Sequence, residues 1–148
     1  MLKNIPKILS PELLKVLMEM GHGDEIVIAD GNFPAASLGQ RIVRCDGHGV
    51  CDLLAAIMQL FPLDAYSEKP VALMEVVPGD TDSEGNPIIP AIWQDYHNII
   101  ETYDPENCKI EMMERFQFYE RAKKAYAVVA TGETAIYANI ILKKGVVK

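Results

Sequence analysis

Apolar positions along the chain follow two spacings, one typical of amphipathic helices and one typical of buried strands. Residues 11–20 carry leucine, valine and methionine at helical spacing, and Ser10 precedes them as a residue suited to cap a helix. Residues 25–29 form a continuous β-branched run, which favours a buried strand. The same patterns predict further helical segments over residues 35–38, 50–60, 91–102 and 115–124, and further strands over residues 41–44, 70–77, 108–113, 125–130 and 136–142.

Strands that alternate with helices predict an α/β fold around a largely buried sheet. A chain of 148 residues is long enough for one domain with a sizeable core, and this chain has neither an internal repeat nor a linker. We therefore expect one compact domain over residues 1–148. The segment over residues 78–90 is rich in Pro, Gly and Asp, which predicts a loop.

Composition and charge limit the classes of partner. The chain is 49% hydrophobic and 24% charged, which is typical of a globular protein. Its net charge of -7 at pH 7 repels nucleic acid, and the basic residues cluster only over residues 121–124 and 143–144. Nucleic acid is therefore not an expected partner.

The cysteine content and the first residues bear on location. Three cysteines do not make a disulfide framework, which fits a reducing compartment. Prolines and charged residues interrupt residues 1–15, so this segment does not resemble a signal peptide. No apolar run is long enough to span a bilayer. We expect a cytoplasmic protein without a membrane partner.

The first candidate for chemistry is His22, which stands between Gly21 and Gly23 directly after the first predicted helix. Glycines at a helix end allow a sharp turn into the following strand, and imidazole is the usual proton shuttle near neutral pH. Asp30 follows that strand, which is short enough for both side chains to border one pocket. The alternative is that His22 is an ordinary turn residue and Asp30 a helix cap.

Three further residues are candidates for binding a polar ligand. Arg115 stands at a predicted strand-to-helix junction, where its guanidinium suits bidentate hydrogen bonds to hydroxyls or carboxylates; the alternative is a surface ion pair with Glu111 or Glu114. Tyr137 and Asn139 share one face of the last predicted strand because side chains alternate along a strand. Two polar groups on one face of an apolar strand favour a ligand site.

Metal and cofactor motifs are weak or missing. Residues 78–85 faintly resemble a calcium loop, but Ala91 stands where a bidentate glutamate is needed. Cys45, His48 and Cys51 lack a fourth zinc ligand nearby. The chain has no phosphate-binding loop and no dinucleotide-binding fingerprint. We expect neither a metal nor a cofactor.

The chain resembles the L-fucose mutarotase family, a relative of the D-ribose pyranase family, from nearly end to end. The matching segments are residues 8–26, Asp30 with residues 33–35, Asp46-Gly47 with residues 52–54, residues 115–116 and 118–122, Thr131-Gly132-Glu133, and residues 137–145. The chain departs from the family at Ala138, which replaces a glycine, and in the loop from Asp80 to Pro90, which looks longer than usual. Alternation along the last predicted strand would turn Ala138 away from the pocket.

The resemblance implies a mixed sheet flanked by helices and a ring-shaped decamer with sites near subunit contacts. It implies that His22 is the catalytic acid/base and that Asp30, Arg115, Tyr137 and Asn139 bind the sugar. Ring opening and reclosure of a hemiacetal would then interconvert the two anomers of L-fucose. Asp30 would either orient the sugar or set the tautomer of His22.

Two alternatives stay open at this point. One is a monosaccharide-binding module without catalysis. The other is interconversion of the pyranose and furanose forms of D-ribose, which uses the same ring opening.

Overall fold

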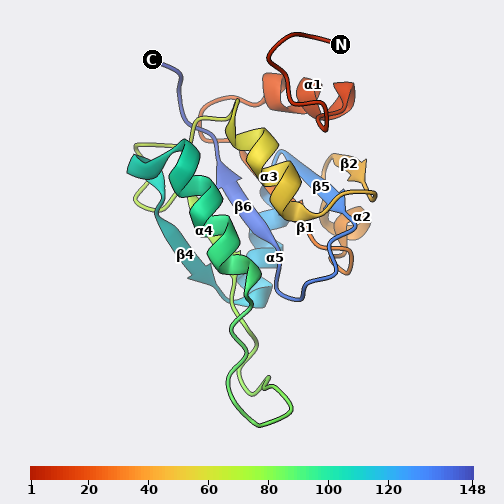
Figure 1. The fold of residues 1–148 in the computed structure, drawn as a ribbon, viewed down its shortest axis with the longest axis vertical. Coiled ribbons are helices and arrows are strands. Elements are labelled where there is room, and N and C mark those ends of the chain that lie inside the picture. Colours follow the sequence, from red (N-terminus) through yellow and green to blue (C-terminus); the bar gives the residue numbers. More distant parts are fainter.

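The structure, a computed structural model, describes residues 1–148 and is built on a six-stranded sheet (Figure 1). The strands are β1 (Glu25–Ala29), β2 (Ile42–Cys45), β3 (Val71–Met74), β4 (Ile110–Met113), β5 (Ala127–Thr131) and β6 (Ile140–Lys143). They lie in the order β2-β5-β1-β6-β3-β4. Strand β6 runs antiparallel to its neighbours β1 and β3, and the other pairs are parallel. The expected mixed sheet of an α/β fold is confirmed.

Helices cover both faces of the sheet. They are α1 (Pro11–Glu19), α2 (Ala35–Leu38), α3 (Val50–Met58), α4 (Ile92–Tyr103) and α5 (Arg115–Lys124), with a 3-10 turn η1 (Pro105–Asn107) after α4. Helices α1, α3 and α4 pack on one face, while α2 and α5 pack on the other (Figure 1).

Successive residues of a strand enter different cores because side chains alternate across a sheet. In β1, Ile26 and Ile28 join the core under α1, α3 and α4, whereas Val27 and Ala29 join the core over α2 and α5. All four are completely shielded from solvent. This burial on both faces explains the uninterrupted apolar run in the sequence.

The helix starts are set by nearby polar groups. The Ser10 hydroxyl accepts a hydrogen bond from the backbone N–H of Leu13 at the start of α1. The carboxylate of Glu114 accepts two backbone N–H groups at the start of α5. Helix α3 uses a distant group, because the carboxylate of Glu133 accepts from the backbone N–H of Val50. The turn after β5 is thereby attached to α3.

The last strand is shorter than its sequence pattern predicts. Residues 136–139 lie outside β6, which begins at Ile140, so the expected strand over residues 136–142 is wrong at its start. Tyr137 has a φ of 56°, in the left-handed region that a strand excludes. Side chains of α4 hold the backbone here in place of a neighbouring strand. The Trp93 indole N–H donates to the carbonyl of residue 137, and the Tyr96 hydroxyl donates to the carbonyl of residue 138.

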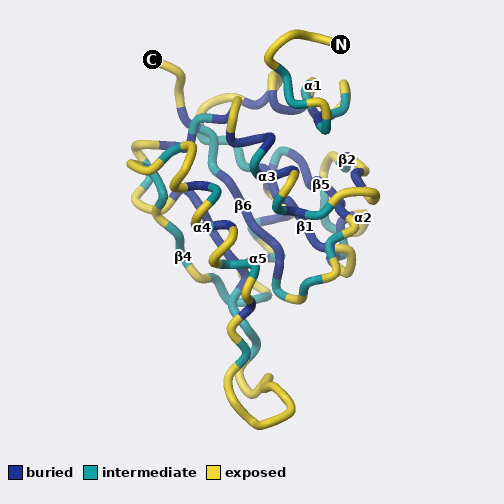
Figure 2. The backbone as a smooth tube through the Cα atoms, viewed as in Figure 1, coloured by how far each residue is buried: buried dark blue, intermediate teal, exposed yellow.

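The loop between β3 and α4 extends from the body of the protein and is mostly exposed (Figure 2). The carboxylate of Asp82 accepts the backbone N–H groups of Glu84 and Asn86, so this acid closes the loop. These hydrogen bonds hold the pKa of Asp82 below its ordinary value. Elsewhere in the fold, none of the helices has the length and apolar character needed to cross a membrane.

Candidate active site

One pocket at the end of β1 is lined by Asp30, Arg115, Tyr137 and Asn139. We call it the strand-end pocket. Its remaining lining residues are Asn32, Phe33, Met74, Val77, Asp80, Tyr119 and Ile136. Its volume is about 250 Å³, near the lower end of small-molecule sites, which begins at about 300 Å³. The pocket is therefore suited to a small polar ligand.

Asp30 and Asn139 hold each other inside this pocket. The backbone N–H of Asp30 donates to Oδ1 of Asn139 at 2.8 Å, and Nδ2 of Asn139 donates to Oδ2 of Asp30 at 3.0 Å. The other carboxylate oxygen accepts the backbone N–H of Asn32 at 2.9 Å. Burial raises the pKa of Asp30 against these hydrogen bonds. Each carboxylate oxygen keeps a lone pair, so the group can still accept a ligand hydroxyl.

Tyr137 is held from two sides. Its backbone carbonyl accepts the indole N–H of Trp93 at 2.8 Å, which anchors the left-handed residue on α4. Its hydroxyl donates to Oδ2 of Asp80 and accepts from the backbone N–H of Val77 at 3.4 Å. Burial and this carboxylate raise the pKa of the Tyr137 hydroxyl. The phenol therefore connects the projecting loop to the pocket.

Ala138 is fully buried and does not line the strand-end pocket. Its carbonyl accepts a hydrogen bond from the Tyr96 hydroxyl at 2.7 Å. Ala138 is turned away from the pocket as expected, but strand alternation is not the reason, because this residue precedes β6. The Tyr96 hydrogen bond holds the backbone here instead.

Arg115 brings an unpaired donor to the pocket. Its Nε is buried without a hydrogen-bond partner, and its guanidinium lies 4.6 Å from the centre of the Phe116 ring. The alternative ion pair with Glu111 or Glu114 is not formed, because Glu111 pairs with Arg121 and Glu114 caps α5. The Arg115 side chain lines the pocket, so its guanidinium can offer hydrogen bonds to a ligand oxygen there.

His22 does not reach the strand-end pocket of its own chain. It precedes β1 and Asp30 follows it. A strand rises about 3.3 Å per residue, so the five residues of β1 separate the two side chains by about 13 Å or more. The expectation that His22 and Asp30 border one pocket is therefore wrong within a single chain, because the chain between them is extended.

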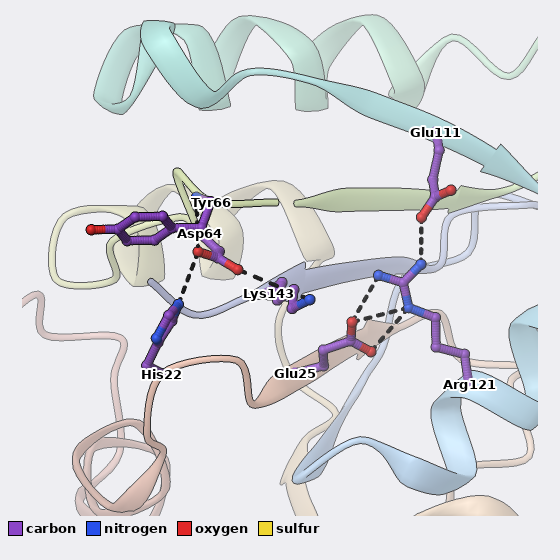
Figure 3. Close-up of polar contacts among 7 residues, drawn as sticks. All are labelled: His22, Glu25, Asp64, Tyr66, Glu111, Arg121 and Lys143. Carbon is purple, nitrogen blue, oxygen red and sulfur yellow. Dashed lines mark hydrogen bonds and ion pairs between the residues drawn. The ribbon is translucent and has the colours of Figure 1, made fainter. Parts of the chain in front are cut away.

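The carboxylate beside His22 is Asp64, not Asp30 (Figure 3). Oδ1 of Asp64 lies 3.0 Å from Nε2 of His22 and also accepts the backbone N–H of Tyr66 at 3.1 Å. The Asp64 side chain is 5% exposed, the His22 side chain 47%. Burial favours the neutral acid, but the hydrogen bonds from His22 and Tyr66 outweigh it and lower the pKa of Asp64.

The remaining hollows and cysteines of the chain lack the groups needed for catalysis or metal binding. A larger hollow of about 730 Å³ lies along the N-terminal segment and α1, but Lys7 is the only ionisable side chain among its lining residues. No three His, Cys, Asp or Glu side chains gather closely enough to hold a metal ion. Cys51 is half-buried, and burial raises the pKa of its thiol to about 11.

Sequence reasoning did not single out the partners of the site residues. Asp64 stands in a short loop after α3 without any motif, and only its burial marks it. Asp80 belongs to a loop that reads as an acidic surface segment. Tyr96 is one of the residues at helical spacing that predict the helix over residues 91–102, and Trp93 lies outside that pattern. Trp93, the single tryptophan of the chain, could have been expected to donate a hydrogen bond, since buried indole N–H groups usually find a partner.

Comparison with known proteins gives consistent matches over the whole chain. The chain is 52% identical to the L-fucose mutarotase of Actinobacillus pleuropneumoniae serotype 5b, a match that covers 99% of this chain and 97% of the relative. A crystal structure of the fucose mutarotase from Streptococcus pneumoniae in complex with L-fucose superposes with a TM-score of 0.91 at 54% identity. That match covers 99% of this chain and 100% of the other.

A more distant match is RbsD from Bacillus subtilis, whose structure was solved in complex with D-ribose. Its TM-score is 0.69 at 28% identity, with all of both chains covered. The family model described as the RbsD / FucU transport protein family matches residues 3–147. The chain therefore belongs to the RbsD / FucU family, as the resemblance in its sequence indicates.

Proposed function

We propose that this protein is an isomerase that interconverts the α and β anomers of L-fucose. One observation carries the proposal: Asp30, Arg115, Tyr137 and Asn139 converge in one small pocket of a chain that is 54% identical to a fucose mutarotase crystallised with L-fucose. A polyol needs donors and acceptors around it, and this pocket offers both.

Each pocket residue has a role that follows from its hydrogen bonds. Arg115 lines the pocket and forms no ion pair within the chain, so its guanidinium would donate to a sugar oxygen. Asp30, oriented by Asn139, would accept a sugar hydroxyl. Tyr137, fixed by Asp80, would provide a hydroxyl and an aromatic edge.

Mutarotation moves two protons and breaks one bond. A base removes the proton of the anomeric hydroxyl, the bond from C1 to the ring oxygen breaks, and an acid protonates that oxygen. Rotation about C1–C2 then presents the other face of the aldehyde, and the same steps in reverse close the ring. One imidazole serves both directions, since it takes the first proton and returns it to the ring oxygen.

His22 is the imidazole that we propose for this role, supplied by a second copy of the chain. It cannot reach its own strand-end pocket across β1, and its side chain is 47% exposed. A neighbouring subunit that docks the start of its β1 against the pocket would bring the two together. The assembly that we propose is the decamer implied by the family resemblance.

Saturation-transfer NMR of L-fucose tests the activity, because it measures exchange between anomers at equilibrium. The protein should accelerate exchange, and His22→Ala should lose on the order of 10²–10⁴-fold, the usual contribution of general acid–base catalysis. His48→Ala is the matched control, since His48 also stands between glycines but does not line the pocket. No acceleration by the unmodified protein would refute the proposed activity.

Mixed oligomers test the shared site. His22→Ala and Arg115→Ala homo-oligomers should each exchange sub-saturating L-fucose more slowly than the unmodified protein, but some sites of a co-assembled mixture combine an intact His22 with an intact pocket. Recovered exchange activity in the mixture supports a site between subunits. Mixing without any recovery, in oligomers shown by mass spectrometry to contain both variants, contradicts it.

The same measurements address the alternatives. The pocket of one chain contains no imidazole, which favours a non-catalytic monosaccharide-binding module if the chain acts alone. That function predicts binding of L-fucose by calorimetry with unchanged exchange rates. Faster exchange of D-ribose than of L-fucose would favour pyranose–furanose interconversion instead.

A further inference from the structure

Two aromatic side chains are more exposed to solvent than any others in the chain, Tyr66 at 70% and Phe116 at 61%. The ring of Phe116 lies 4.6 Å from the guanidinium of Arg115 and 6.3 Å from the ring of Tyr119. Arg115 and Tyr119 both line the strand-end pocket, so Phe116 stands at its edge. Tyr66 belongs to the loop between α3 and β3 and lies beside His22. The two exposed rings therefore mark the two halves of the proposed site.

Tyr66 and His22 are held side by side. Their ring centres are 5.6 Å apart, with an angle of 54° between the ring planes. Oδ1 of Asp64 accepts the backbone N–H of Tyr66 at 3.1 Å and lies 3.0 Å from Nε2 of His22, so both residues contact one carboxylate. Figure 3 shows the phenol beside the imidazole, with its hydroxyl directed away from the other labelled residues. A pyranose in hydrogen-bond contact with this imidazole is wide enough to reach the Tyr66 ring as well.

The fold itself does not use the Tyr66 ring. The ring belongs to neither hydrophobic core, and its hydroxyl makes no hydrogen bond within the chain. The loop is held by its backbone instead, because the N–H of Asp64 donates to the carbonyl of Lys143 at 3.0 Å and the N–H of Ser67 donates to the carbonyl of Asp64 at 3.2 Å. A large exposed apolar group on an ordered backbone is a feature of binding surfaces. The Tyr66 ring is therefore available for a contact outside its own chain.

The strand-end pocket needs a further surface to close its mouth. Its apolar lining residues are Phe33, Met74, Val77 and Ile136, which can contact the C–H groups of a sugar from within. Sites for small molecules usually bury about 70–90% of the ligand surface, and a pocket of about 250 Å³ lies below their usual volume. In the proposed assembly the closing surface is the one that carries His22. Tyr66 is the exposed aromatic group of that surface.

We propose that Tyr66 is a sugar-binding residue of this site, supplied together with His22 by the neighbouring subunit. This inference rests on the proposed function of the strand-end pocket. The Tyr66 ring closes the mouth of the pocket and contacts the C–H groups of a sugar whose hydroxyls are bound by Asp30, Arg115 and Asn139. A tyrosine ring buries a large apolar area with little loss of side-chain freedom. It exchanges no proton with the sugar, so it contributes to affinity and not to the chemical step.

The kinetic test separates KM from kcat in the exchange of L-fucose anomers. Tyr66→Ala should raise KM by roughly 2- to 10-fold, the range expected for one aromatic contact, with little change in kcat. Tyr66→Phe should restore most of the affinity that Tyr66→Ala loses, because the ring makes the contact. Tyr103→Ala is the matched control, since Tyr103 is an exposed tyrosine of α4 that does not line the pocket. An unchanged KM in Tyr66→Ala, or an equal rise in Tyr103→Ala, would overturn the proposal.

Mixed oligomers test which subunit supplies the ring. A mixture of Tyr66→Ala and Arg115→Ala subunits contains some sites with Tyr66, His22 and Arg115 all intact, so exchange at low L-fucose should rise above the mean of the two homo-oligomers. A mixture of Tyr66→Ala and His22→Ala subunits contains no site with both of these residues intact, so exchange should stay at that mean. In oligomers shown by mass spectrometry to contain both variants, recovery in the second mixture or none in the first would overturn the proposal.

A fluorine label gives a measurement that needs no catalysis. When 4-fluorophenylalanine replaces Tyr66, its ¹⁹F resonance should shift as L-fucose is added, with a midpoint at the Kd measured by calorimetry on the same protein. Light scattering should give Tyr66→Ala the same oligomer mass as the unmodified protein. A resonance that does not move at saturating L-fucose, or an affinity loss caused by dissociation of the oligomer, would make Tyr66 an interface residue only and overturn the proposal. An unmodified protein that neither binds L-fucose nor accelerates its exchange refutes the proposed function instead.

Discussion

Asn139 and Asp30 are joined by two hydrogen bonds of opposite direction, one to the backbone and one to the carboxylate of Asp30. Both residues are more than nine-tenths buried. They stand just beyond facing ends of the antiparallel neighbours β1 and β6. The pair therefore ties the end of the sheet together at the point where the strand-end pocket opens.

Asn139→Ala should lower both stability and ligand affinity. It leaves the backbone N–H of Asp30 without a partner, which costs about 1–3 kcal/mol of unfolding free energy, and it releases the carboxylate. Urea denaturation and calorimetric titration with L-fucose measure the two effects. Asn98→Ala, on the exposed face of α4, should change neither. Full affinity in Asn139→Ala would contradict the assigned orientation of Asp30.

Arg115→Ala should weaken L-fucose binding with little loss of stability. The guanidinium forms no ion pair within the chain, and a hydrogen bond to a charged group contributes about 1.5–3 kcal/mol, or roughly tenfold or more in Kd. Arg44→Ala is the control, because Arg44 is exposed and pairs with Asp46 away from the strand-end pocket. Equal affinities in the two variants would remove Arg115 from the site.

Tyr96→Phe should lower both stability and ligand affinity, because Tyr96 supports the backbone of the strand-end pocket on the side away from the ligand. It removes only the hydroxyl that binds the carbonyl of Ala138 at 2.7 Å, and an unsatisfied buried carbonyl costs about 1–3 kcal/mol. Because residue 138 lies between Tyr137 and Asn139, we also expect a several-fold weaker affinity for L-fucose. Tyr103→Phe, at an exposed position of the same helix, is the comparison. An unchanged Kd would mean that Trp93 alone fixes this backbone.

Arg121→Ala should destabilise the fold without changing the chemistry. Its guanidinium binds Glu25 at the start of β1 and Glu111 in β4 (Figure 3). Removal leaves two carboxylates facing each other, with side chains that are 17% and 32% exposed. We expect a loss of about 2–3 kcal/mol, below the range for fully buried pairs. Lys123→Ala, which breaks the exposed pair with Glu120, should cost well under about 1 kcal/mol.

Asp64 should contribute an acid-sensitive part of the stability. Its pKa in the folded protein lies below the ordinary value of 3.8, so folding favours the ionised form. The contribution is therefore present above pH 3.8 and is lost as the pH falls through the folded pKa. The difference in unfolding free energy between the unmodified protein and Asp64→Asn should shrink over that range. A difference that grows on acidification would contradict the sign of the shift.

The separation of His22 from Asp30 shows how far local patterns reach. The run from Glu25 to Ala29 identifies a buried strand, and an extended strand cannot fold back to join the residues at its two ends. Strand length is thus enough to place the two side chains apart in one chain. The local pattern does not show which carboxylate lies beside His22, because Asp64 is 42 residues away along the chain.

Tyr137 shows where a local pattern gives the wrong prediction. The residues from Ile136 to Leu142 have strong β character, yet the strand begins only at Ile140. Hydrogen bonds from Trp93 and Tyr96, more than 40 residues earlier, hold the backbone in a conformation that β propensity disfavours. Tertiary contacts therefore override the local preference at this pocket.

The sequence by itself determined the helices, most of the strands and the family, because apolar periodicity, helix caps and extended motif matches are properties of neighbouring residues. Only the tertiary structure decided the strand order, the convergence of Asp30, Arg115 and Asn139 in one pocket, and the pairing of His22 with Asp64. These depend on which distant segments pack together, and that choice is made by the whole core.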